Sequence, residues 1–236
     1  MVCRRRQRAD RGAFRHRESA LITQFIAEGL RRGEPGIIAV FEERPNGYTE
    51  RAAGFGLDLK SPREQGKLEI LYLRPLDPSV DETMQELLEA IVRVGAKRLA
   101  IDSLVGFEMA LAPSFRADFR ESLYRMIGAL TGAGVTILST VEVEDTFDAM
   151  PFSYYAISFD IIRLRYVEID GQIRKVIVVV KMRAGNHSKD IREYVITHKG
   201  VVVVGPRQTD YTRLTSGLPE HVGHQAEAAP EPKATQ

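Results

Sequence analysis

The sequence has little of several features that would define a protein class at once. It contains a single cysteine, Cys3, which excludes an internal disulfide framework and is typical of a reducing compartment. No apolar run approaches the ~20 residues that a membrane-spanning helix needs. The 33 basic residues nearly balance the 32 acidic ones, so the overall charge predicts no particular partner. We therefore expect a cytoplasmic protein with no membrane partner.

Charge is uneven in one place, the first 17 residues. Residues 1–17 carry seven arginines against a single acid, Asp10. No apolar stretch follows these charges, so they do not resemble a secretory signal. Their composition predicts a disordered basic arm. Only one aromatic residue, Phe14, is interleaved with the arginines, which argues against a nucleic-acid partner.

Helical and strand patterns alternate from residue 18 to residue 140. Apolar residues recur at helical spacing in three segments, which are 18–30, 81–94 and 115–130. Short, nearly continuous apolar runs, typical of buried strands, lie between them at 37–41, 68–73, 99–101 and 135–140. A short helix is expected at 48–55, and Asp81 is expected to cap the second of the long helices. The alternation predicts an α/β fold with a mostly parallel sheet and helices on both faces.

The pattern changes after about residue 157. Runs at 161–166 and 173–182 flank Asp170-Gly171, a strong signal for the turn of a β-hairpin. Two further runs, 191–197 and 201–204, predict a second antiparallel pair. Since no linker separates this half from the first, we expect its strands to extend the same sheet. The predicted domain therefore covers residues 18–205, and the Pro-, Ala- and Glu-rich residues 206–236 are expected to form a disordered tail.

Polar groups follow three of the predicted strands: Glu42-Glu43, Asp102-Ser103 and Ser139-Thr140. Because ligands of parallel sheets bind beyond the carboxyl ends of the strands, these groups should converge on one edge. A carboxylate at the end of an apolar strand can hold a magnesium ion beside a nucleotide phosphate. The same pattern is also typical of an aspartate that only caps the next turn.

Several segments together resemble the KaiC-like family of RecA-type ATPases. They are residues 22–43 (ITQFIAEGLRRGEPGIIAVFEE), 54–59, 66–71, the Asp102 strand, 119–140 and 181–187 (KMRAGNH). The resemblance spans residues 18–204 and depends on the order and spacing of these motifs. It implies a RecA-like core that assembles into rings, commonly hexamers, with ATP and Mg²⁺ bound between neighbouring subunits.

The resemblance also implies roles for individual residues. Glu42 and Glu43 match the catalytic glutamates that orient the attacking water, and Asp102 matches the magnesium ligand. The other implied nucleotide contacts are Ser139, Thr140, Lys181, Arg183 and His187. Lys181 and Arg183 share one strand face and would reach the neighbouring subunit's phosphates. These residues also have alternative roles that involve no nucleotide. Ser139 and Thr140 would be ordinary strand-end hydroxyls, Lys181 and Arg183 an edge-strand charge pair that discourages aggregation, and His187 a surface-loop histidine.

The sequence departs from the family at the phosphate-binding loop. A P-loop has the pattern G-x-x-x-x-G-K-[ST], and the matching spacing here begins at Gly12 and ends at Ser19. Ser19 would be a magnesium and phosphate ligand. Arg17 stands in place of the second glycine and Glu18 in place of the lysine, so the loop would repel a triphosphate. The family's central first strand also has no counterpart, since residues 3–11 are nearly all polar.

Three explanations for this departure remain open at this point: a partner that fills the gap, a decayed copy, and a frameshifted or misplaced gene start. We expect an ATPase-family protein with impaired ATP and Mg²⁺ binding, in a homo-oligomeric ring or in a hetero-ring with an intact paralogue. One alternative is a non-catalytic regulatory or scaffold subunit. Another is a serine/threonine autokinase, as in the clock-protein relatives.

Overall fold

The computed structural model describes residues 18–41, 43–73, 79–110, 119–142, 160–183, 185–207, 211–212 and 220–221. The chain divides into two compact units. The first contains Met1–Ser158 and Tyr194–Val202, and the second contains Phe159–Glu193 and Val203–Gln236. The predicted basic arm and most of the predicted tail lie outside the described residues. No helix in the described part of the chain has both the length and the apolar character needed to cross a membrane.

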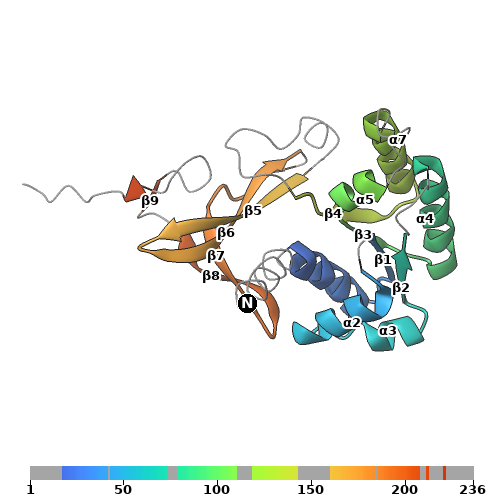
Figure 1. Ribbon diagram of the computed structural model, residues 1–236, viewed down its shortest axis with the longest axis horizontal. Helices are drawn as coiled ribbons and strands as arrows, with labels where there is room; N and C mark the ends of the chain where they lie inside the picture. Colours follow the sequence, from blue (N-terminus) through green and yellow to red (C-terminus); the bar gives the residue numbers. More distant parts are fainter. Residues whose placement is uncertain are drawn as a thin grey trace, which may run out of the picture. The chain divides into compact units, whose positions relative to one another are not determined.

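The first unit is built on a four-stranded parallel sheet with the strand order β2-β1-β3-β4 (Figure 1). Its strands are β1 (Gly36–Val40), β2 (Leu68–Tyr72), β3 (Arg98–Asp102) and β4 (Thr136–Ser139). Each lies where an apolar run predicted it. β1 pairs with both β2 and β3, and the last residue of β1 is opposite Asp102. The parallel sheet predicted from the sequence is therefore confirmed.

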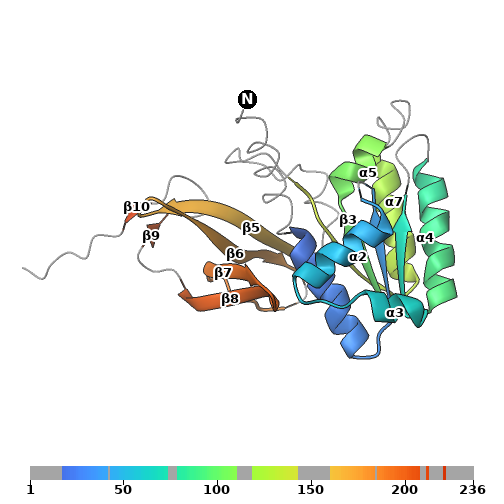
Figure 2. The same ribbon diagram turned by 60° about the horizontal axis from the view of Figure 1, so that its bottom comes forward.

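Helices cover both faces of this sheet (Figure 2). One side carries the helix over residues 18–31, α2 (Pro45–Gly54) and α3 (Lys60–Glu64). The other side carries α4 (Val80–Val94), α5 (Leu104–Ala110) and α7 (Phe119–Gly132). Alternate residues of β1 enter two different cores: Ile37 packs with α4 and α7, and Ile38 packs with Ile22 and Ile26 of the first helix. A strand that is buried on both faces must be continuously apolar, as β1 is.

The N-terminal cap of α4 differs from the sequence prediction. Ser79, not Asp81, is the cap residue. The Ser79 hydroxyl accepts a hydrogen bond from the Glu82 amide at 3.1 Å, and the Glu82 carboxylate accepts one from the Ser79 amide at 2.8 Å. This reciprocal capping box satisfies two backbone donors that a helix start leaves free, and the sequence pattern Ser-x-x-Glu already carried its signal.

β4 is less buried than the strands inside the sheet. All five residues of β1 are buried, whereas Thr136 is exposed and the three other residues of β4 are only half-buried. β4 is the last strand in the order, and none of the described residues pairs with its outer edge.

Antiparallel strands form a second sheet in the order β5-β6-β7-β8. They are β5 (Asp160–Ile169), β6 (Gln172–Met182), β7 (Arg192–Thr197) and β8 (Gly200–Arg207). The predicted hairpin is confirmed, with positive φ angles of 52° at Asp170 and 70° at Gly171 in its turn. The expectation that these strands extend the parallel sheet was wrong for the described residues. A sheet grows only through paired backbones, and no described strand pairs β4 with β5.

The β7–β8 turn belongs to the first unit. The Gln24 side chain binds it from the first helix: its Nε2 donates to the Val201 carbonyl at 3.3 Å, and its Oε1 accepts from the Val201 amide at 2.8 Å. Gly56 lies close beneath the turn, with a φ of +73° and only 1.9 Å between an added Cβ and the His198 carbonyl oxygen. Two short strands, β9 (Tyr211–Thr212) and β10 (Glu220–His221), pair within the stretch that we expected to lack structure.

Candidate nucleotide site

Asp102 lies at the carboxyl end of β3, beside the end of β4. The Thr140 hydroxyl donates a hydrogen bond to Asp102 Oδ1 at 2.9 Å, and the Thr140 amide donates to the Ile101 carbonyl at 3.0 Å. Thr140 is buried, whereas Asp102 is half-buried and keeps access to solvent. The ends of β3 and β4 thus bring the Thr140 hydroxyl and the Asp102 carboxylate together, as expected for neighbouring parallel strands.

Glu43 lies just beyond the end of β1 and is held by an arginine of α2. Arg51 Nη2 and Nε donate to Glu43 Oε2 at 2.8 Å and 3.1 Å. The Arg51 side chain is 15% exposed and that of Glu43 36% exposed. The guanidinium also stacks on the Tyr48 ring, 4.4 Å from its centroid. Glu43 is therefore a fixed carboxylate at the same end of the sheet; Glu42 is outside the described residues.

The buried Tyr48 contacts both Arg51 and the first helix. The Tyr48 hydroxyl lies 3.0 Å from that of Thr23, whose own proton goes to the Ser19 carbonyl, so Tyr48 is the donor. Burial and then the negative charge of Asp102 raise the pKa of Tyr48 above its ordinary value. Tyr48 therefore stays neutral at physiological pH.

Both carboxylates affect the pKa of Arg51. Burial alone would lower the pKa of Arg51, but the hydrogen bond to Glu43 and the negative charges of Glu43 and Asp102 outweigh it and raise that pKa. One guanidinium Nη1 is buried without a hydrogen-bond partner among the described atoms. At the carboxyl ends of β1, β3 and β4, which form one rim of the sheet, Arg51 is thus bonded to the Glu43 carboxylate, and Thr140 is bonded to the Asp102 carboxylate.

Two predicted serine ligands lie at this end of the sheet in different settings. Ser19 is in the first turn of the helix over 18–31 and is buried. Ser139 is the last residue of β4 and is half-buried. The structure thus places Ser19, Ser139, Thr140 and Asp102 on elements that meet at one rim. The remaining residues of the P-loop spacing, from Gly12 to Arg17, lie outside the described residues.

Lys181, Arg183 and His187 belong to the second unit. Lys181 is near the end of β6, and the Arg183 amide donates to Asp160 Oδ1 at 3.3 Å. Desolvation and the charge of Arg183 lower the pKa of Lys181. His187 is half-buried in the segment between β6 and β7.

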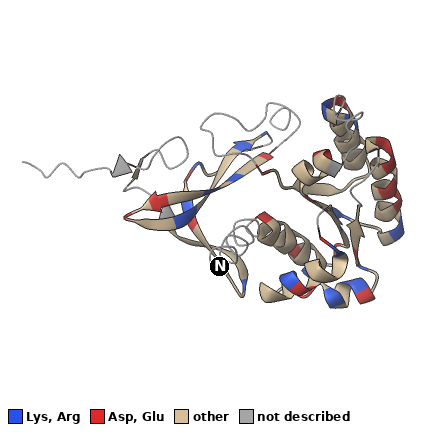
Figure 3. Cartoon of the chain, viewed as in Figure 1, with Lys and Arg blue, Asp and Glu red and all other residues tan. Residues whose placement is uncertain are grey.

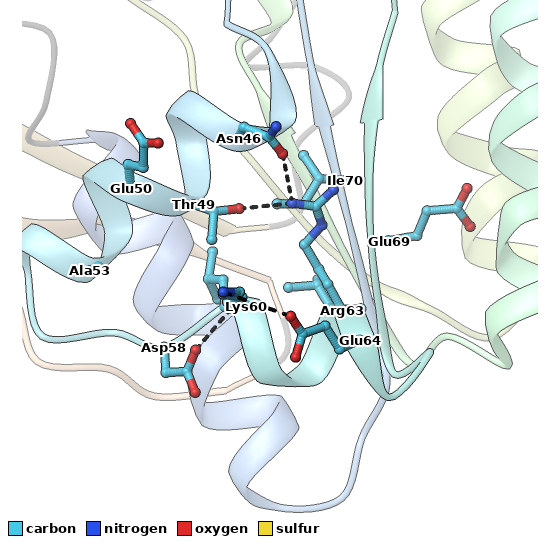
Figure 4. Close-up of a pocket in the computed structure, with 12 residues that line it drawn as sticks. Asn46, Thr49, Glu50, Ala53, Asp58, Lys60, Arg63, Glu64, Glu69 and Ile70 are labelled. Atoms are coloured by element: carbon cyan, nitrogen blue, oxygen red, sulfur yellow. Dashed lines mark hydrogen bonds and ion pairs between the residues drawn. The ribbon is translucent and has the colours of Figure 1, made fainter.

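A cavity of about 890 Å³ lies elsewhere in the first unit, along α2, α3 and β2 (Figure 4). In it, Arg63 Nη1 donates to Thr49 Oγ1 at 3.1 Å, and Lys60 pairs with Glu64 at 3.9 Å. Four acidic side chains and two basic ones line the cavity, and none of the predicted site residues does. Figure 3 likewise shows charges of both signs over these helices, with acidic residues along α4.

The rim can supply oxygen ligands to magnesium. Mg²⁺ is commonly bound by one or two carboxylates, with water and substrate phosphates completing its shell. Asp102, steadied by Thr140, fits that role. No cluster of three or more His, Cys, Asp or Glu residues occurs among the described residues, so an all-protein cage is not built there.

Sequence reasoning missed Arg51 and Tyr48. The sequence carried only a weak signal for them. Tyr48 and Arg51 are three residues apart and so share one face of α2 with the buried Ala52. Burying such groups requires partners, and those partners are Glu43 and Thr23.

Comparisons with known proteins agree with this geometry. The family model described as "ATPase: KaiC" matches residues 18–208. The circadian clock protein KaiC3 of Synechocystis is 30% identical over 215 residues, which cover 88% of this chain and 41% of that protein. The circadian clock oscillator protein KaiC of Picosynechococcus is 28% identical, with 89% and 41% covered. This chain thus spans about two-fifths of the length of these curated relatives.

A solved structure points the same way. The KaiC-like protein of the hyperthermophilic archaeon Pyrococcus horikoshii superposes with a TM-score of 0.72 at 26% identity, over 80% of this chain and 84% of that one. The sequence resemblance and the parallel sheet with its helices are therefore confirmed together. The chain belongs to the KaiC family of RecA-type ATPases.

Proposed function

We propose that this chain supplies the glutamate and magnesium side of an ATP site and does not hold ATP tightly by itself. The observation that carries the proposal is the rim, where the Thr140 hydroxyl is bonded to Asp102 and Arg51 is bonded to Glu43. Asp102 would hold Mg²⁺, with Ser139 and Thr140 beside the phosphates. Glu43, together with Glu42, would orient the attacking water, and Arg51 would keep the Glu43 carboxylate in place.

Two residues oppose tight binding of ATP. In a P-loop, backbone amides surround the phosphates and a lysine neutralises them. Arg17 adds a side chain where the backbone has to approach, and Glu18 adds a negative charge where a positive one is needed. Glu18 and Ser19 lie next to each other in the first turn of the helix over 18–31, where the P-loop spacing would place the lysine and the hydroxyl.

Isothermal titration of the purified chain with MgATP tests this proposal. We expect no saturable binding tighter than about 1 mM, because like charges meet at the loop. The Asp102→Asn variant should behave the same way, since little binding remains to be lost. A micromolar dissociation constant for the wild-type chain would contradict the proposal.

Lys181 and Arg183 give the chain a second role within a ring. They would reach the phosphates that a neighbouring subunit binds in its own complete P-loop. Cations supplied in trans accelerate phosphoryl transfer by ~10³–10⁵-fold in other NTPases. The chain would then be a passive subunit of a hetero-ring, with a hexamer expected from the family.

Mixing experiments test this second role. The chain is combined with an intact KaiC-family protein, and assembly and ATP hydrolysis are measured with and without nucleotide. We expect ATP-dependent co-assembly and at least a tenfold lower stimulation for Lys181→Ala, with Lys175→Ala on the same strand as the matched control. Assembly that ignores nucleotide, with unchanged hydrolysis, would contradict it and favour a scaffold function.

A further inference from the structure

Both oxygens of the Glu43 carboxylate lie against α2. Arg51 Nη2 and Nε donate to the same oxygen, Oε2, at 2.8 Å and 3.1 Å. A carboxylate oxygen has about two lone-pair sites, so these two donors fill those of Oε2. The other oxygen, Oε1, lies over the first turn of α2, where a Cβ added to Gly47 would be only 3.1 Å from it. The side chain of Glu43 is therefore folded back onto α2.

Arg51 is packed in place, which distinguishes this ion pair from the exposed pairs of the chain. Its guanidinium is largely buried and stacks on the ring of Tyr48. Tyr48 is itself buried, and its hydroxyl is bonded to that of Thr23 at 3.0 Å. The Lys60–Glu64 pair, by contrast, joins two exposed side chains at 3.9 Å. Exposed pairs of that kind are weak, whereas an arginine that donates two hydrogen bonds and is fixed by packing holds its geometry.

This geometry limits what Glu43 can do in the proposed site. Glu43 would accept one proton of the attacking water while the water oxygen bonds to the terminal phosphorus and the ADP oxygen leaves with the electron pair of the broken bond. A proton acceptor needs a free lone pair within hydrogen-bond reach of the water. Oε2 has none while Arg51 is bonded to it, and Oε1 lies against α2. Glu43 is thus held at the site but can accept the proton only when Arg51 releases it.

We propose that Arg51 is an inhibitory residue, which by bonding Glu43 prevents this carboxylate from accepting the proton of the attacking water. The inference rests on the proposed ATP site and adds a second barrier to hydrolysis. Arg17 and Glu18 limit the binding of ATP, whereas Arg51 limits the chemical step. Repairing the loop alone should therefore restore binding of ATP and leave hydrolysis slow.

Carbodiimide labelling of the wild-type chain tests the contact without nucleotide. A carbodiimide and glycine ethyl ester convert accessible carboxyl groups to amides, and tandem mass spectrometry locates the label at single residues. The side chain of Glu43 is 36% exposed, so the reagent can reach it. Glu50 is an exposed carboxylate on the same helix and is the internal reference. We expect Glu43 to react at least about tenfold more slowly than Glu50, because Arg51 is bonded to it.

Three variants assign the effect to Arg51. Arg51→Met keeps a long unbranched side chain but removes both hydrogen bonds, and should bring the reactivity of Glu43 close to that of Glu50. Arg51→Lys keeps the charge but loses the planar fork, and should give an intermediate rate. Arg63→Met removes a guanidinium that is bonded to Thr49 instead, and should change neither rate. Thermal melts check that the variants fold, and the comparison within the wild-type chain does not depend on them.

Single-turnover hydrolysis tests the effect on the chemical step, in the full chain that carries Arg17→Gly and Glu18→Lys. A general base contributes ~10²–10⁴-fold to the rate of such a step. In this background we expect Arg51→Met to raise the rate constant at least about tenfold, and to change the dissociation constant of MgATP by less than about twofold. Arg63→Met should change neither quantity.

Two results would overturn the inference alone: a Glu43 that reacts as fast as Glu50 in the wild-type chain, or hydrolysis that is unchanged or slower in the Arg51→Met variant although MgATP is bound. Slower hydrolysis would mean that Arg51 positions Glu43 for catalysis and does not restrain it. If the repaired chain binds no MgATP, the proposed ATP site fails, and the inhibitory role of Arg51 fails with it.

Discussion

The strands β1 and β6 have similar apolar sequences and reach different degrees of burial. Every residue of β1 is buried. β6 contains five consecutive apolar residues, Val176 to Val180, yet only Val176 is buried, and Val180 is 48% exposed. Helices cover both faces of β1, whereas the described residues of the second unit form strands and no helix. An apolar run thus predicts a strand, and the elements packed against it decide how much of it is buried.

The largest expected effect comes from truncating an isoleucine in each sheet. Ile101 on β3 is 1% exposed, and Ile173 on β6 is 63% exposed. We expect Ile101→Ala to lower the free energy of unfolding by about 2–5 kcal/mol, because it leaves a cavity in the core. Ile173→Ala should change it by less than about 0.5 kcal/mol. Urea unfolding of both variants checks this, and equal losses would contradict the comparison.

A smaller loss of stability is expected when the hydrogen bonds to the β7–β8 turn, which belongs to the first unit, are removed. Gln24→Ala removes both hydrogen bonds to the Val201 backbone, and we expect a loss of about 1–2 kcal/mol. Gln85 on α4 bonds only to the exposed Glu89 and is the matched control. Gln85→Ala should be nearly neutral in the same unfolding experiment. A neutral Gln24→Ala would mean that the turn is held by other contacts.

The smallest effect is a dependence of stability on alkaline pH. Burial and the charge of Asp102 raise the pKa of Tyr48 above 10, the value that the unfolded chain retains. The unfolded state therefore loses this proton first, and stability falls as pH rises past about 10, by up to about 1.4 kcal/mol per pH unit.

Unfolding curves at pH 9, 10 and 11 measure this dependence. Tyr48→Phe should flatten it relative to wild type, whereas Tyr124→Phe, at a residue that is 67% exposed, should leave it unchanged. If the slopes of wild type and Tyr48→Phe are equal, Tyr48 ionises as it would in water.

Local patterns in the sequence predicted much of the fold and located the strand ends at which the candidate site lies. Period and turn residues located the strands of the parallel sheet and the Asp170-Gly171 hairpin, because these signals lie within a few residues of one another. The strand-end residue Asp102 was found because parallel strands end together. Its bond to Thr140 fits that expectation.

Side-chain contacts between different elements could not be predicted from these local patterns. Arg51 of α2 bonds to Glu43, which lies beyond the end of β1, and Arg98 bonds to Glu34 at 2.7 Å across 64 residues. Many arginines in the sequence could have made either contact, and only packing selects among them. Strand pairing is equally non-local, which is why a separate second sheet was not anticipated.

Nucleotide titration of a repaired loop tests the central claim most directly. Arg17→Gly with Glu18→Lys recreates the pattern Gly-Xaa₄-Gly-Lys-Ser from Gly12 to Ser19. We predict that this double variant binds MgATP at least tenfold more tightly than the wild-type chain, and that Asp102→Asn in the same background removes the gain. Equal affinities of the wild-type and repaired chains, or a gain that does not need Asp102, would contradict the account.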